Sequence, residues 1–203
     1  MRIISGEKKG MNLSRPKSMV SRPITDMVKE SLFNILQKYD IPEGKRIADV
    51  FSGVGSIGLE ALSRGAVFAA FVEKDPKIFS LLQKNIEKAG FSDRSKTVRA
   101  NAFNIGAPMD MEGKKYDCIF LDPPFPLTKN VGPKSRLARL MDILPGQLNK
   151  KGLVVVRTHK NVKISEGYGN LQVIDARTWG INSVNIYQLK ENNEAERAEV
   201  LAE

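Results

Sequence analysis

The chain has 203 residues, of which 41% are hydrophobic and 27% charged, the profile of a soluble globular protein built as one domain with elaborations. Its single cysteine excludes a disulfide framework and a multi-cysteine zinc site, and no apolar run approaches the roughly 20 residues that span a bilayer. The N-terminus lacks the apolar core of a signal peptide, so we expect a cytoplasmic protein.

The predicted elements divide the chain into two parts. Residues 2–14 are predicted as two short extended pieces around a turn, and residues 25–39 as a helix with Thr25 as its N-cap. From residue 46 onward, apolar strands alternate with amphipathic helices, which implies a parallel α/β sheet whose last two strands could form an antiparallel hairpin. The expected strands are Ile47–Phe51, Phe68–Val72, Thr97–Arg99, Tyr116–Leu121, Leu153–Val156, Leu171–Ala176 and Val184–Leu189. The expected helices are a short one that ends near Gly65, one from Pro76 to Gly90, and one over residues 136–149.

The charge is unevenly distributed along the chain. Lys and Arg number 32 against 23 Asp and Glu, a formal net charge of +9. Two stretches are strongly basic, while the tail after Lys190 is acidic; the basic residues are Arg2, Lys8, Lys9, Arg15, Lys17 and Arg22 in the first stretch and Lys129, Lys134, Arg136 and Arg139 in the second. A basic body suits a polyanionic partner, most simply nucleic acid, with a merely well-solvated surface as the alternative.

The segment from Asp49 to Gly58 follows a predicted strand and begins a predicted helix. Its glycines Gly53, Gly55 and Gly58 have the G-x-G-x-x-G spacing, and Glu73 ends the next strand about 20 residues later. Glycines let the backbone pass close to a ligand, and a carboxylate in that place accepts hydrogen bonds from ribose hydroxyls. The segment therefore predicts a site for a nucleoside-containing ligand without naming the ligand.

Two features favour S-adenosylmethionine over a dinucleotide. Asp49 suits the cationic amino acid end of S-adenosylmethionine, whereas it would repel a pyrophosphate. Asn101-Ala102-Phe103 follows the third strand, where the amide could contact an adenine edge and Phe103 could lie against the adenine ring. A dinucleotide site and a plain glycine turn with a capping aspartate remain as alternatives.

The tetrapeptide Asp122-Pro123-Pro124-Phe125 directly follows the fourth strand, at the edge of the sheet where open α/β sheets bind ligands. The prolines stiffen the turn, so that Asp122 and the Pro123 carbonyl can both accept hydrogen bonds from an exocyclic amine of a nucleic-acid base. Holding the two amine hydrogens outward directs the nitrogen lone pair at a methyl donor, and Phe125 would stack on a base that has left its helix. The alternative is a rigid turn with an aspartate cap.

These motifs resemble those of class I S-adenosylmethionine-dependent amino-methyltransferases. Residues 2–6, 9–13, 22–33 and 58–66 resemble, more narrowly, the family that methylates guanine N2 in bacterial small-subunit ribosomal RNA. The resemblance runs from residue 2 to about 189 and implies a Rossmann-like, seven-stranded, mostly parallel sheet with helices on both faces and an antiparallel C-terminal hairpin. It divides the chain into an N-terminal hairpin and helix (1–40), a methyltransferase domain (41–190) and an acidic tail (191–203).

Three sets of site residues follow from the motifs and the resemblance. The catalytic residues are Asp122, Pro123, Pro124 and Phe125. The residues that bind S-adenosylmethionine are Asp49, Ser52, Gly53, Gly55, Ser56, Gly58, Glu73, Lys74, Asn101, Ala102 and Phe103. The residues that bind nucleic acid are Arg2, Lys8, Lys9, Arg15, Arg22, Lys129, Lys134 and Arg136. The family usually has an acid at the position of Asn101, so we expect a weaker cofactor contact there without loss of activity.

The expected partner is small-subunit ribosomal RNA in partly or fully assembled subunits, bound by a monomer that needs no metal and no membrane. Three other functions remain open: an adenine N6-methyltransferase, a nicotinamide-dependent oxidoreductase, and a non-catalytic RNA-binding assembly factor. His159 is expected to be a surface or RNA-facing residue, because this chemistry needs no histidine base.

Overall fold

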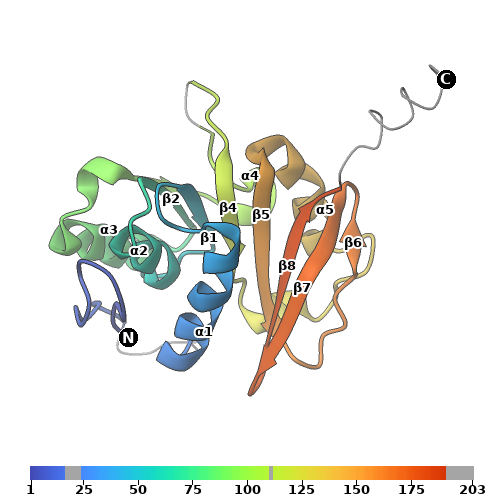
Figure 1. The fold of residues 1–203 in the computed structure, drawn as a ribbon, viewed down its shortest axis with the longest axis horizontal. Helices are drawn as coiled ribbons and strands as arrows, with labels where there is room; N and C mark the ends of the chain where they lie inside the picture. The colour runs from blue at the N-terminus through green and yellow to red at the C-terminus, as the bar shows by residue number, and fades with distance from the viewer. Residues whose placement is uncertain (17–23, 110–111, 191–203) are drawn as a thin grey trace.

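The computed structural model describes residues 1–16, 24–109 and 112–190 (Figure 1). Arg22 and the acidic tail over residues 191–203 lie outside the described residues. In the described part of the chain, no helix is long and apolar enough to cross a membrane.

A single mixed sheet forms the centre of the molecule, with the strand order β3-β2-β1-β4-β5-β8-β7-β6. The strands are β1 (Arg46–Val50), β2 (Phe68–Glu73), β3 (Ser95–Arg99), β4 (Tyr116–Leu121), β5 (Leu148–His159), β6 (Gly167–Tyr168), β7 (Leu171–Trp179) and β8 (Asn182–Leu189). The first five in this order are parallel, and β8, β7 and β6 add antiparallel pairings at one edge. The predicted α/β fold with an antiparallel C-terminal hairpin is confirmed.

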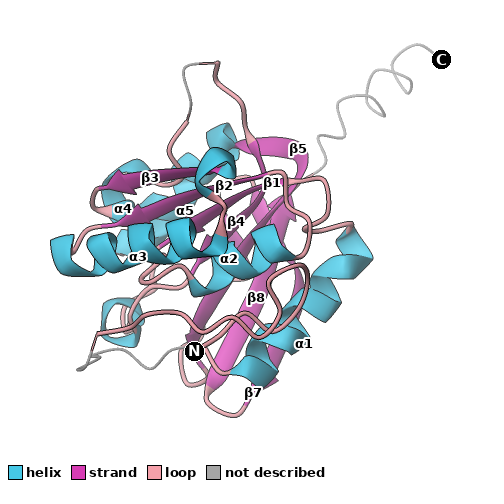
Figure 2. Ribbon diagram, turned by 90° about the vertical axis from the view of Figure 1, so that its left-hand side faces the viewer, coloured by secondary structure: helices cyan, strands magenta, loops and turns pink. Residues whose placement is uncertain are grey.

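Helices cover both faces of the sheet (Figures 1 and 2). They are α1 (Asp26–Leu36), α2 (Ser56–Ser63), α3 (Pro76–Ala89), α4 (Ala102–Ile105) and α5 (Arg136–Ile143). Because side chains alternate along a strand, β1 sends Ile47 into the core under α1, α2 and α3 and Ala48 into the core under α5. Each face of the sheet thus has its own apolar core.

Local sequence signals explain where the main helices begin and end. The Thr25 hydroxyl accepts a hydrogen bond from the Val28 N–H at the start of α1, and Asp75 caps α3 directly before Pro76. Gly90 ends α3 in the left-handed conformation, with φ 71°. The predicted Thr25 cap and the predicted bounds of the 76–90 helix are therefore confirmed.

The N-terminal extension, residues 1–16, folds as a hairpin-like loop against α2 and α3 (Figure 2). Arg2 pairs with Asn12 across the loop, as the two predicted extended pieces require. The Glu7 N–H donates to the Ser63 carbonyl of α2 at 2.8 Å, and the Ser14 N–H donates to Asn85 of α3 at 2.8 Å. The division of the chain at residue 40 stays a prediction; α1 shares its apolar core with α2 and α3.

Three details of the predicted fold are wrong. Over the described residues the sheet has eight strands instead of the predicted seven. The additional one is the two-residue strand β6, which pairs with β7 and is too short to show a pattern in the sequence. The helix predicted over 136–149 ends at Ile143 and continues as a 3-10 helix, Leu144–Gln147, because Pro145 lacks the amide that an α-helix needs. Strand β5 already begins at Leu148 and is longer than predicted.

Candidate active site

One pocket of about 330 Å³ lies at the carboxyl ends of β1, β2 and β4. Most of the predicted site residues line it: Asp49, Ser52, Gly53, Ser56, Glu73, Lys74, Asn101, Ala102, Phe103, Asp122, Pro123, Pro124 and Phe125. The two predicted sites, which are separated along the chain, are therefore two parts of one pocket. The remaining predicted cofactor residues, Gly55 and Gly58, lie in the same loop and helix but not on the pocket wall.

The glycine loop between β1 and α2 is fixed to the end of β2. The N–H groups of Phe51 and Ser52 both donate to the Val72 carbonyl, at 3.2 and 3.0 Å. Phe51 has φ 84°, an uncommon conformation for a bulky side chain that must be held by its surroundings. Gly55 precedes α2 with φ 90°. This loop thus places backbone and an aromatic ring, rather than a large charged side chain, against the pocket.

Gly58 has a packing role that its position in the motif did not reveal. A Cβ atom on Gly58 would lie 2.3 Å from the Phe71 ring of β2, so only glycine lets α2 approach the sheet this closely. Its N–H donates to the Asp49 carboxylate at 2.8 Å.

Asp49 is a buried carboxyl group at the base of the pocket, with 1% of its surface exposed. Burial raises its pKa to about 7, and the nearby carboxylates of Asp122 and Glu73 add to the rise, while the Gly58 hydrogen bond opposes it. A cation beside this carboxyl group would therefore stabilise its ionised form.

Glu73 stands at the end of β2 and turns its carboxylate to the glycine loop. One oxygen accepts the Gly53 N–H at 3.1 Å and the other accepts the Asp75 N–H at 2.7 Å. Each oxygen keeps a further lone pair, so the carboxylate can still accept hydrogen bonds from two adjacent hydroxyls.

A pair of aromatic rings forms another wall of the pocket. Phe51 and Phe103 meet edge to face with centroids 4.9 Å apart. Asn101 is the N-cap of the short helix α4, where its side-chain oxygen accepts the Phe103 N–H at 3.1 Å. The amide thus fixes the turn that presents Phe103, in addition to any contact with a ligand.

The tetrapeptide Asp122–Phe125 follows β4 as predicted and leads into a 3-10 helix, Phe125–Thr128. The Leu127 N–H donates to the Pro124 carbonyl at 2.8 Å, which closes this turn. Asp122 forms a two-pronged ion pair with Arg157 of β5, at 2.6 and 2.9 Å. Burial raises the pKa of Asp122, and Arg157 offsets part of that rise.

The pocket wall also contains residues that were not predicted from the sequence, including Met1, Ile24, Phe51, Leu127 and Arg157. Phe51 stands inside the quoted glycine motif, so its position was a usable signal. Arg157 carries no such signal, because its partner is 35 residues away in the sequence. Met1 brings the N-terminal extension to the pocket rim.

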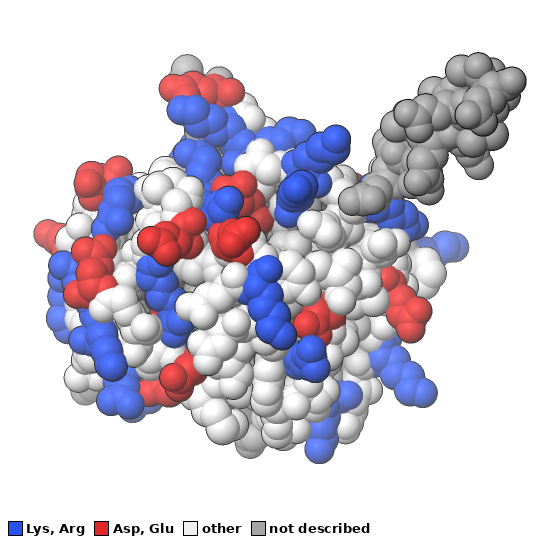
Figure 3. All heavy atoms as spheres, viewed as in Figure 1, with Lys and Arg blue, Asp and Glu red and all other residues white. Residues whose placement is uncertain are grey.

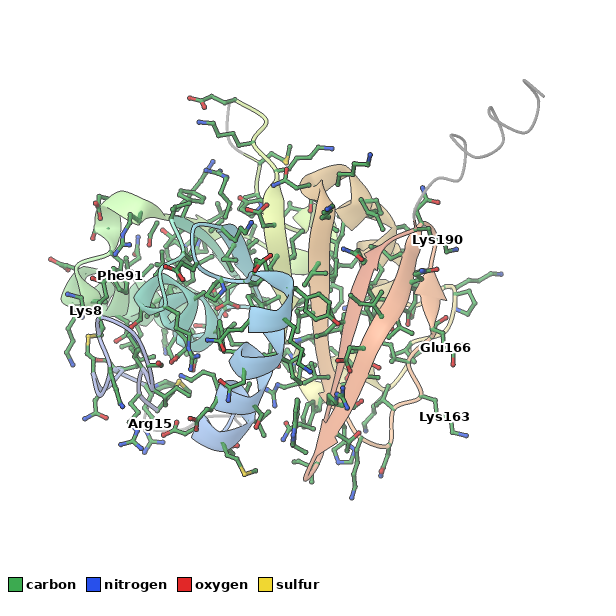
Figure 4. All side chains as sticks on the ribbon, viewed as in Figure 1. Lys8, Arg15, Phe91, Lys163, Glu166 and Lys190 are labelled. Atoms are coloured by element: carbon green, nitrogen blue, oxygen red, sulfur yellow. The ribbon has the colours of Figure 1, made fainter. Side chains whose placement is uncertain are left out.

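The predicted nucleic-acid residues form two groups along the chain, one in the N-terminal extension and one after the Asp122–Phe125 turn. Arg2 follows the pocket residue Met1, and Lys129 comes two residues after the pocket residue Leu127. Lys8 and Arg15 lie on the side of α3 and the N-terminal extension, opposite Lys163 and Lys190 at the β6–β7 side (Figure 4). In Figure 3 the basic side chains are spread over the visible face with acidic ones among them. Their role in binding RNA stays a prediction.

The strand order, the glycine loop after β1 and the antiparallel β8 together define the fold of the class I methyltransferases. The chain belongs to the family described as "Conserved hypothetical protein 95", which it matches over residues 1–188. The predicted membership of a bacterial ribosomal RNA methyltransferase family is confirmed.

Individual relatives agree with this assignment. The chain is 32% identical to the "Putative rRNA methyltransferase YlbH" of Bacillus subtilis, over 93% of this chain and 98% of that protein. It is also 32% identical to "Ribosomal RNA small subunit methyltransferase D" of Haemophilus influenzae, over 93% of each chain. The solved structure titled "Putative methyltransferase yhhF from Escherichia coli" is 28% identical and superposes with a TM-score of 0.76, covering 95% of this chain and 99% of the other. The nicotinamide-dependent oxidoreductase finds no support among these relatives.

Proposed function

We propose that this methyltransferase transfers a methyl group from S-adenosylmethionine to the N2 amine of a guanine in small-subunit ribosomal RNA. The observation that carries the proposal is the shared pocket, in which Asp122–Phe125 and the glycine loop line one cavity. The name of the Haemophilus influenzae relative supports a ribosomal substrate. The preference for guanine N2 rests on the resemblance of the N-terminal stretches described above.

The residues of the pocket fit S-adenosylmethionine. Glu73 would accept the ribose hydroxyls, since each of its oxygens keeps a lone pair beyond its backbone contact. Asp49 and the glycine loop would hold the methionine part, because the charge of an ammonium group stabilises the ionised form of a buried carboxyl group whose pKa is raised. Phe103 and Asn101 would frame the adenine. When bound, S-adenosylmethionine supplies a methyl group on a positively charged sulfur.

The acceptor amine would be oriented by the chain's own hydrogen-bond acceptors. Asp122 and the Pro123 carbonyl would each accept a hydrogen bond from one amine hydrogen, so that the nitrogen lone pair points into the cofactor part of the pocket. Phe125 would stack on the base, which has to leave its helix to enter the pocket. No cysteine nucleophile takes part, since Cys118 is buried within β4.

The substrate RNA would be bound as part of a partly or fully assembled small subunit, by a monomer acting in the cytoplasm. Arg2, Lys9, Arg15, Lys129 and Arg136 are exposed and would contact phosphates. Lys8, Lys134 and Arg22 are proposed for the same role, although Arg22 is outside the described residues.

Transfer of a radiolabelled methyl group tests the proposal. The enzyme is given S-adenosylmethionine with one of three acceptors: naked small-subunit RNA, assembled subunits that lack the modification, or duplex DNA. We expect label in the subunits or their RNA, recovered as N2-methylguanosine. Label recovered as N6-methyladenosine would show that the enzyme is an adenine N6-methyltransferase instead. Cofactor binding without transfer to any acceptor, together with tight RNA binding, would favour an assembly factor.

A further inference from the structure

We propose that Arg157 is a positioning residue of the amine site, where its guanidinium group fixes the orientation of both the Asp122 carboxylate and the Phe125 ring. This inference rests on the proposed function, because it assigns Arg157 a part in orienting the acceptor amine. Its geometry, however, can be tested on the protein alone.

The guanidinium holds the carboxylate through a planar fork. The Arg157 Nε atom lies 2.6 Å from one Asp122 oxygen, and a terminal nitrogen lies 2.9 Å from the other. Two parallel hydrogen bonds fix the plane of a carboxylate as well as its place, which a single contact does not. Because each oxygen keeps another lone pair, Asp122 can still accept an amine hydrogen in the plane that Arg157 sets.

Arg157 is itself fixed from a third strand. Its other terminal nitrogen donates to the Asn182 side-chain oxygen at 2.6 Å, and the Asn182 amide donates to the Trp179 carbonyl at 3.2 Å. Arg157 is 7% exposed, and it stands opposite Val184 in the pairing of β5 with β8. The hydrogen bonds therefore connect the end of β4 to the antiparallel edge of the sheet.

The same guanidinium lies over the ring of Phe125, with its central carbon 5.1 Å from the ring centroid. The ring also meets His159 edge to face, with centroids 5.5 Å apart. Arg157 thus contacts both of the side chains that would touch the target base. Loss of the guanidinium would leave the Asp122 carboxylate and the Phe125 ring without a common support.

Charge gives Arg157 a second effect on Asp122. Burial raises the pKa of Asp122, and Asp49 on β1 is close enough for the two carboxylates to repel each other. Arg157 opposes this rise through its charge and its hydrogen bonds. A protonated carboxyl group would present an O–H to the amine and lose an acceptor. The ring of His159, edge to face with Phe125, is a further titratable group near this end of the pocket.

Three variants separate positioning from simple structural support. Arg157→Gln removes the charge and the fork, while Arg157→Lys keeps the charge without the fork. Arg177→Gln is the matched control, since Arg177 pairs with Asp175 at 2.8 Å on β7 with 52% of its side chain exposed. Transfer to small-subunit RNA is measured as kcat and KM across pH 5 to 9, together with the affinity for S-adenosylmethionine and the urea midpoint.

We expect Arg157→Gln to lower kcat about 100-fold and to shift the acid limb of the pH profile to higher pH, because the charge that lowers the pKa of Asp122 is lost. The affinity for S-adenosylmethionine should stay within about threefold of the wild-type value. Arg157→Lys should keep the acid limb of the wild-type pH profile, and its kcat should lie between that of Arg157→Gln and that of the wild type. Arg177→Gln should change neither kcat nor the pH profile. A folded Arg157→Gln protein with the wild-type kcat and pH profile would overturn the inference. If this variant does not fold, Arg157→Lys carries the test through its expected loss of kcat.

A readout without substrate separates this inference from the proposed function. The titration of Asp122, followed by ¹³C-NMR of its labelled carboxyl carbon, should move to higher pH in Arg157→Gln and stay in place in Arg157→Lys. An unmoved titration in Arg157→Gln refutes the inference even if the wild-type enzyme methylates RNA. A moved titration in a protein that methylates no RNA refutes the proposed function and leaves the hold of Arg157 on Asp122 established.

Discussion

The ammonium group of Lys29 on α1 lies 3.2 Å from the carboxylate of Glu60 on α2, and both side chains are excluded from solvent. The Glu60 oxygens also accept the backbone N–H groups of Ile4 and Ser5, at 2.8 and 3.1 Å. Lys29 in turn donates to the Arg2 carbonyl at 2.7 Å. The buried pair therefore joins the N-terminal extension to the first helix after the glycine loop.

Glu60→Gln is expected to destabilise the protein strongly. The substitution leaves Lys29 buried without its opposite charge, a change that costs about 3–5 kcal/mol in the free energy of unfolding. Urea denaturation measures it. The control is Glu7→Gln, whose ion pair with Arg94 is partly exposed and should contribute about 1 kcal/mol or less. Equal effects of the two substitutions would contradict the role given to Glu60.

Gly6 and Gly10 offer a matched pair in the N-terminal extension. Both have positive φ, at 80° and 88°, but a Cβ on Gly6 would lie 1.7 Å from the Ser63 carbonyl oxygen, whereas a Cβ on Gly10 meets nothing within 4 Å. Gly10→Ala should therefore cost only the backbone strain, about 1–2 kcal/mol. Gly6→Ala should cost about 2 kcal/mol more, because the extension has to move off α2.

Urea denaturation and proteolysis of the N-terminal segment measure the two glycine variants. Faster cleavage is expected for Gly6→Ala alone. Similar stability and cleavage in both variants would show that the contact with Ser63 does not hold the extension.

Local signals made much of this structure predictable from the sequence. Pro76 and Gly90 mark the two ends of α3, and Asp122 follows a short apolar run that is typical of a buried strand. Because parallel strands end at one edge of the sheet, Asp122 and Glu73 could be expected in one place. The structure puts both on the wall of the same pocket.

Features that depend on distant pairing were not predictable. Arg157 extends an apolar run and looks like the polar end of a strand, and only the register of β5 against β4 brings it to Asp122. A glutamate in a short helix is ordinarily expected on the solvent-exposed face. Glu60 is instead buried, where it accepts backbone N–H groups of the N-terminal extension. The strand β6, Gly167–Tyr168, has too few residues to show any periodicity.

Cofactor binding is expected to release protons through Asp49. The pKa of this buried carboxyl group is about 7 in the free protein, and an ammonium neighbour in the complex would lower it. Binding then favours the ionised form, so that the affinity for S-adenosylmethionine should rise about tenfold from pH 6 to pH 8. Calorimetry in buffers of different ionisation enthalpy measures the protons released. In Asp49→Asn the pH dependence should disappear; a pH-independent affinity in the wild type would refute the contact.

RNA binding is expected to depend on the N-terminal extension. Lys8→Gln with Lys9→Gln should weaken binding to small-subunit RNA and lower the slope of log K against log salt by about 1 to 2, because two phosphate contacts are lost. Lys163→Gln is the control, since Lys163 lies on the opposite side of the molecule (Figure 4). An unchanged slope in the double variant would remove the extension from the RNA surface.

The most direct test of methyl transfer at the Asp122 site compares the wild type with Asp122→Ala. Nucleosides from small-subunit RNA are analysed by mass spectrometry after reaction with S-adenosylmethionine, and cofactor affinity and folding are measured on the same samples. We predict N2-methylguanosine with the wild type and none with Asp122→Ala, while the variant still folds and binds the cofactor nearly as well. Formation of N2-methylguanosine by Asp122→Ala at the wild-type rate would contradict the role of Asp122 in orienting the amine.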